Sequence, residues 1–68
     1  MKTDKCEIIA HLEERQLKLA TVYSKGLAYI IAEKMVEVYA TTADIITVEI
    51  GQRIEYSMFT GKAKERIS

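Results

Sequence analysis

The second half of the chain alternates between apolar and polar side chains with a period of two. From residue 46 to residue 58, apart from a turn at 51–52, one parity is apolar and the other is polar. The apolar positions are Ile46, Val48, Ile50, Ile54, Tyr56 and Met58. Because successive side chains of a strand point to opposite faces of a sheet, this pattern predicts a hairpin of two half-buried strands.

The register of this hairpin depends on the length of its loop. A three-residue loop at 51–53 places Ile50 opposite Ile54, Val48 opposite Tyr56, and Ile46 opposite Met58. A two-residue loop would set Glu49 against Ile54 and mix the two faces, so we expect the longer loop. The apolar positions 46, 50, 54 and 58 also fit the i+4 spacing of a helix. Abundant Ile, Val, Thr and Tyr nevertheless favour strands.

A third strand is expected directly before this hairpin. Val36, Val38 and Ala40 alternate with Glu37 and Tyr39, and a polar turn follows at 41–44. We therefore predict a three-stranded antiparallel meander over about 36–59. One face of such a sheet is apolar and needs a cover.

The first half of the chain has a helical pattern of apolar residues. These recur at spacings near three, four and seven, and Glu14 precedes Lys18 by four positions on the polar face. The pattern predicts a helix over about 5–23. Gly26 then interrupts it, so that either a second helix begins at Leu27 or one long helix continues to about Lys34. The expected fold is α+β, with an N-terminal helix or helical hairpin (about 5–34) packed on the meander.

The segment 27–35 is apolar on nearly all sides, which is typical of a buried helix. A chain of this length has little interior of its own in which to bury such a helix. We therefore expect residues Leu27, Tyr29, Ile30 and Ile31 to form the interface of a homo-oligomer, a dimer or larger.

Composition limits the ways in which the chain can be stabilised. It has 68 residues, one cysteine (Cys6), one histidine (His11) and no net charge. We expect one domain over 1–68, with 61–68 as a flexible basic tail. An intramolecular disulfide is impossible with one cysteine, and this cysteine usage favours a reducing, cytoplasmic location. The sequence has neither a run of apolar residues that would cross a membrane nor the apolar core of a signal peptide.

The sequence does not carry a set of residues for catalysis. His11 is the single candidate base, with Glu7 four positions before it, and we interpret it as a solvated surface histidine. Cys6 is interpreted as a small, partly buried side chain rather than as a reactive thiol. We therefore predict that the protein is not an enzyme and that it binds neither a cofactor nor a metal.

Charge distribution indicates two kinds of partner. The middle of the chain is acidic, and its residues Glu37, Glu49 and Glu55 are candidates for docking a basic protein, with Glu49 and Glu55 opposite each other. The preferred hypothesis is a small regulatory or adaptor protein that acts by self-association and by binding another protein. The alternative is a dimeric nucleic-acid-binding regulator, whose contacts would be Lys62, Lys64, Arg66 and Tyr56.

Overall fold

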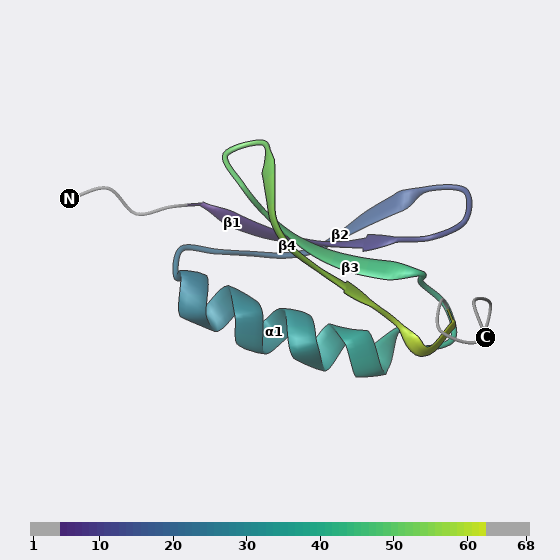
Figure 1. Ribbon diagram of the computed structural model, residues 1–68. Helices are drawn as coiled ribbons and strands as arrows, with labels where there is room; N and C mark the ends of the chain where they lie inside the picture. Colours follow the sequence, from purple (N-terminus) through teal and green to yellow (C-terminus); the bar gives the residue numbers. More distant parts are fainter. Residues whose placement is uncertain (1–4, 63–68) are drawn as a thin grey trace.

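The computed structural model describes residues 5–62, which form four strands and one helix (Figure 1). The elements follow one another as β1 (Cys6–His11), β2 (Gln16–Val22), α1 (Lys25–Val38), β3 (Ile45–Ile50) and β4 (Arg53–Phe59). The strands make one antiparallel sheet in the order β2-β1-β3-β4. Helix α1 runs along one face of this sheet, and the other face is open (Figure 1).

The predicted fold of an N-terminal helix packed on a three-stranded meander is wrong in its first half. Residues expected to form a helix over about 5–23 instead form the hairpin of β1 and β2. In β1, Cys6, Ile8 and Ala10 are fully buried, and they alternate with residues of the open face. The Leu12 amide donates to the Arg15 carbonyl at 2.8 Å and closes the turn between the strands.

Helix α1 begins at the interruption that the sequence predicted, with Lys25 as its first residue, and continues further than expected. The Ser24 hydroxyl accepts a hydrogen bond from the Leu27 amide at 3.3 Å, so Ser24 caps the helix and Gly26 lies in its first turn. The helix ends at Val38. The strand predicted over 36–40 is therefore wrong, because its short alternation of apolar residues equally fits the last turn of an amphipathic helix.

The hairpin of β3 and β4 confirms the strands predicted over 46–58 and corrects their loop. The loop has two residues, Gly51 and Gln52, with φ of 57° and 69°. This left-handed pair is typical of a type I′ turn. Glu49 lies opposite Ile54, as a two-residue loop requires, and Glu55 is an extra residue that forms a β-bulge. The bulge restores the predicted pairs, so that Val48 lies opposite Tyr56 and residue 46 opposite residue 58.

The core lies between α1 and the two central strands. Its largest fully buried apolar side chains are Ile8, Ile46 and Val48. On the helix, Ala28 and Ala32 are the residues without exposed surface. They lie four positions apart on one side of α1, and their small side chains let the helix approach the sheet closely. The core is consequently thin.

The chain that leaves β4 is attached to the connection between α1 and β3. Thr60 is fully buried, and its hydroxyl donates to the Ala43 carbonyl and lies 3.1 Å from the Asp44 carbonyl oxygen. The Thr60 amide donates to the same Asp44 carbonyl at 3.0 Å, and the Lys62 amide donates to the Ala40 carbonyl at 2.7 Å. These bonds hold the end of the described chain beside the end of α1.

Candidate interaction surface

Strand β4 forms an edge of the sheet and is the most exposed of the four strands. Six of its seven residues are exposed and Met58 is half-buried. Of the seven large apolar side chains exposed within residues 5–62, three lie on β4: Ile54 (63%), Tyr56 (41%) and Phe59 (55%). We call these three side chains, together with the outer backbone of the strand, the β4 edge.

The side chains of the β4 edge lie on both faces of the sheet. Tyr56 is on the helix side, where its ring packs edge-on against Tyr29 with ring centroids 5.2 Å apart and planes at 64°. Phe59 and Ile54 lie on the open side, opposite Ile45 and Glu49 of β3. The bulge residue Glu55 forms an ion pair with Lys25 at 3.1 Å, which ties β4 to the first turn of α1.

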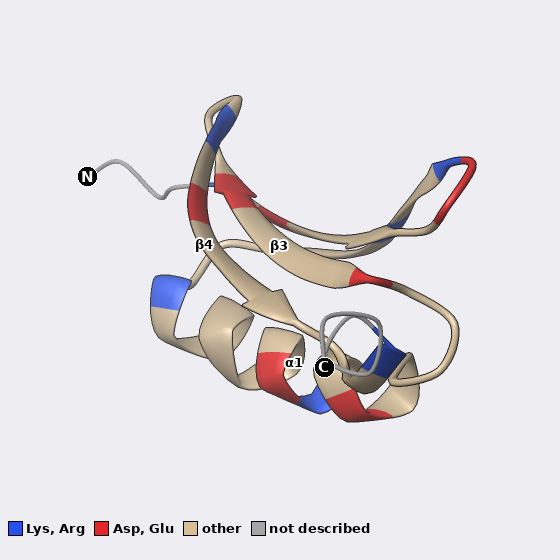
Figure 2. Cartoon of the chain, turned by 45° about the vertical axis from the view of Figure 1, so that its right-hand side comes forward, with Lys and Arg blue, Asp and Glu red and all other residues tan. Residues whose placement is uncertain are grey.

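The opposite edge of the sheet, β2, has a different character. Its apolar residues pack against the core and are half-buried, whereas its exposed positions are Gln16, Lys18 and Thr21. Beyond Glu55, β4 carries no charged residue up to Phe59, and this part of the strand is tan in Figure 2. Figure 2 also shows that both hairpin ends turn away from α1. The two edges of the sheet thus differ in polarity.

The structure separates the four residues that the sequence predicted as an oligomer interface. Leu27 (47%) and Ile30 (66%) are exposed on α1, whereas Tyr29 and Ile31 are half-buried and packed against the core. The apolar pattern of this segment indicated a helix that is buried on all sides. The segment is instead exposed on one side. Ile30 is one of four residues lining a shallow hollow of about 510 Å³ on the outer surface of the helix, with Glu33, Lys34 and Glu37.

The three acidic residues predicted to dock a basic partner do not come together. Glu37 lies on the outer surface of α1, 3.8 Å from Lys34. Glu49 lies on the open face of β3, and Glu55 is bonded to Lys25 on the helix side. The expected opposition of Glu49 and Glu55 is wrong, because the bulge leaves Glu49 opposite Ile54.

The open face has polar pairs between neighbouring strands. Glu7 and Lys18 form an ion pair of 2.5 Å across β1 and β2. The hydrogen bond to Lys18 lowers the pKa of the Glu7 carboxyl, and the same contact raises the pKa of the Lys18 ammonium. His11 does not approach Glu7, because four strand residues span roughly 13 Å. Its Nε2 atom instead lies 2.8 Å from the Thr47 hydroxyl.

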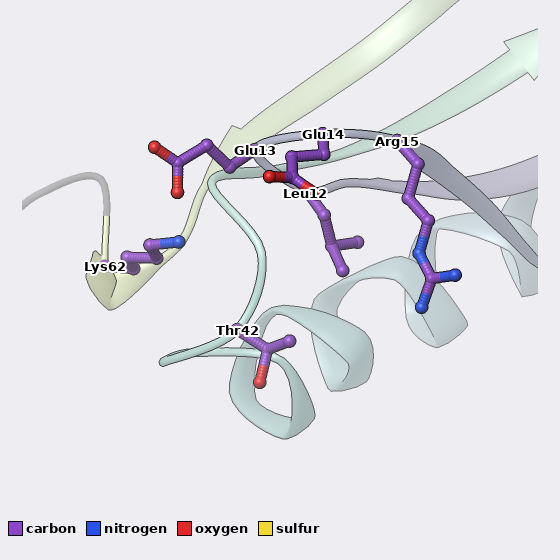
Figure 3. Close-up of a pocket in the computed structure, with 6 residues that line it drawn as sticks. All are labelled: Leu12, Glu13, Glu14, Arg15, Thr42 and Lys62. Carbon is purple, nitrogen blue, oxygen red and sulfur yellow. The ribbon is translucent and has the colours of Figure 1, made fainter.

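A polar hollow of about 330 Å³ lies where the β1–β2 turn meets the end of the described chain (Figure 3). It is lined by Leu12, Glu13, Glu14, Arg15, Thr42 and Lys62. In Figure 3 the Lys62 side chain points toward that of Glu13, so an acidic group accompanies this cation. Of the other predicted nucleic-acid contacts, Tyr56 packs on Tyr29, and Lys64 and Arg66 lie outside the described residues.

Sequence reasoning missed Ile54 as a surface residue. The alternation placed Ile54 on the buried parity, and the position of β4 at an edge depends on pairing between β1 and β3 that the sequence does not reveal. Composition gives no signal for the edge, because β4 is no more apolar than β3.

Three findings concern the described residues as a whole. Between residues 5 and 62 we find no group of three His, Cys, Asp or Glu side chains arranged to hold a metal ion. In the same part of the chain, α1 is too short and insufficiently apolar to cross a membrane. Comparisons with protein-family models, with curated proteins and with solved structures find no match to this chain.

Proposed function

We propose that this chain is a small non-catalytic binding protein, of a regulatory or adaptor kind, that acts by self-association and by contact with another protein. The observation that carries the proposal is the β4 edge, where Ile54, Tyr56 and Phe59 are exposed on one edge strand of the sheet. A strand of this kind presents free backbone donors and acceptors beside apolar side chains, and is a template for pairing with another chain.

The thin core gives a physical reason for a partner. A domain of 68 residues buries only about 60% of the surface of its unfolded chain, so its stability is small. Here three of the nine buried apolar residues are large aliphatic side chains without exposed surface, Ile8, Ile46 and Val48. Covering the exposed apolar residues of β4 would add to this burial, and association would stabilise the fold by mass action.

The nucleic-acid alternative receives less support from the described residues. Tyr56 packs against Tyr29 rather than beside Lys62, and Lys62 shares its hollow with Glu13 and Glu14. The two described residues predicted for this role, Tyr56 and Lys62, are therefore not brought together as a stacking ring and a cation, the combination that binds single-stranded nucleic acid.

Sedimentation velocity over a wide range of concentrations tests the proposed self-association. We expect the apparent mass to rise from that of one chain, 7.7 kDa, toward that of a dimer as the protein is concentrated. The rise should persist at high salt, because apolar contacts are not screened. A mass of one chain at every concentration would contradict the proposed self-association.

A further inference from the structure

We propose that a second copy of this chain pairs with the β4 edge, so that two sheets join into one continuous antiparallel sheet of eight strands. The inference rests on the proposed self-association and names the surface that it uses. It assigns to β4 the role of oligomer interface, which the sequence pattern assigned to Leu27, Tyr29, Ile30 and Ile31.

The contrast between the two edges selects β4. Proteins protect free edges with charged side chains, bulges and short strands. Both β2 and β4 contain a bulge, at Leu19 and Glu55. At β2 an exposed lysine, Lys18, adds further protection. β4 carries two charged residues, Arg53 and Glu55, but Glu55 is drawn toward α1 by its ion pair with Lys25. The edges differ most in their large apolar side chains, three of which are exposed on β4 and none on β2.

The charges of β4 permit pairing with a copy of itself. A two-fold axis at the midpoint of Arg53–Phe59 passes through Tyr56. Because Glu55 is the extra residue of the bulge, Ile54 then lies opposite Ser57 of the second copy on the open side, and Arg53 lies opposite Met58 on the helix side. No like charges oppose each other in this register, whereas a shift of the axis to Glu55 would set that carboxylate against itself.

The pairing would cover apolar side chains on both faces of the sheet. With the two-fold axis perpendicular to the sheet, both helices lie on the same face. The two Tyr29–Tyr56 pairs then lie along the seam between the helices. On the open face, Ile54 and Phe59 of each copy lie beside the new strand pair. All three exposed apolar residues of β4 thereby lose part of their contact with water.

Two charge variants and one matched control test this surface. Ile54→Lys and Phe59→Lys each place a cation on the open side of the β4 edge. Ile30→Lys makes the same change on α1, at a residue as exposed as Ile54. We expect each β4 variant to weaken self-association by roughly tenfold or more, as for residues at the centre of an interface. The control should associate like the unmodified chain, and circular dichroism should show all three folded.

Hydrogen exchange on the unmodified protein provides a readout that does not depend on a variant. We expect amides of 53–59 to become more protected as the concentration rises, while those of β2 do not change. Protection that does not depend on concentration would overturn the inference, as would a concentration-dependent gain at β2.

The outcomes separate this inference from the proposed function. If Ile30→Lys dissociates the protein and the β4 variants do not, self-association stands but its surface is α1, and the inference is wrong. If the unmodified chain has the mass of a monomer at every concentration, both are wrong.

Discussion

Replacing Thr60 by valine tests how the chain after β4 contributes to the stability of the fold. Valine has nearly the same shape as threonine but lacks the hydroxyl that donates to the Ala43 carbonyl. The Asp44 carbonyl keeps its bond from the amide of residue 60, whereas the Ala43 carbonyl loses the donor described here. Both Ala43 and Thr60 are fully buried, so the carbonyl would be left without water as well.

Leaving one buried acceptor without a hydrogen bond lowers the free energy of unfolding by about 1–3 kcal/mol. In a domain of this size each 1 kcal/mol lowers the midpoint of thermal unfolding by about 4–8 °C. We therefore expect a loss of at least about 4 °C, measured by circular dichroism at one fixed protein concentration. Thr60→Ser is the matched control, because it keeps the hydroxyl and loses only a methyl group.

The comparison between the two variants decides the result. If the hydroxyl matters for the reason given, Thr60→Ser is the more stable variant. An unchanged midpoint for Thr60→Val, or a lower midpoint for Thr60→Ser than for Thr60→Val, would refute the argument, because the methyl contact and not the hydrogen bond would then hold the segment.

Three further predictions concern the turn, the core and the open face. Gln52→Gly should stabilise the fold by up to about 1 kcal/mol, since φ is 69° at this position, whereas Gly51→Ala should destabilise it; urea unfolding of both variants checks this. Ile8→Ala should cost about 2–5 kcal/mol, because the side chain is fully buried, and a smaller loss in the same assay would indicate that the thin core collapses around the cavity. Because Lys18 lowers the pKa of Glu7, the stability from this pair is present above the unfolded pKa of the carboxyl and is lost as pH falls through the folded pKa. In Glu7→Gln the free energy of unfolding should therefore fall less steeply as the pH is lowered. An unchanged pH dependence would contradict a stabilising role of the Glu7–Lys18 pair.

The second hairpin was predictable because the alternation of apolar and polar residues is long. The face of the sheet on which the residues before its bulge lie was not predictable. Ile54 and Tyr56 have the same parity, and the sequence pattern placed both on the buried face. The extra residue Glu55 between them reverses this relation, so that Ile54 is on the open side and is 63% exposed. A bulge of one residue leaves no mark on composition or periodicity that would locate it.

The first hairpin was mistaken for a helix for the same reason. The bulge at Leu19 places Leu17 and Ala20, which are three positions apart, on the same side of β2. A spacing of three is typical of a helix face, and the four-residue turn at 12–15 adds further helical spacings between β1 and β2. Two strands with a bulge and a turn thus reproduce the apolar pattern of an amphipathic helix.

The candidate surface was only partly predictable. Sequence reasoning treated all apolar residues of 27–35 alike, whereas packing distinguishes them by their side of the helix. Ala28 and Ala32 lie on the side that faces the sheet, Tyr29 and Ile31 flank it and are half-buried, and Ile30 lies on the outer side. The exposed part of β4 followed from the strand order, which no local pattern determines.

The central position of β1 and β3 has a consequence for the rate of folding. Each hairpin joins residues close in sequence and can form within about 1–10 μs, whereas β1 and β3 pair residues as distant as Cys6 and Ile50. The entropy of closing that long loop must be overcome before the contacts of the core can form. The slowest step of folding should therefore be the meeting of two preformed hairpins, with α1 as the connection that brings them together.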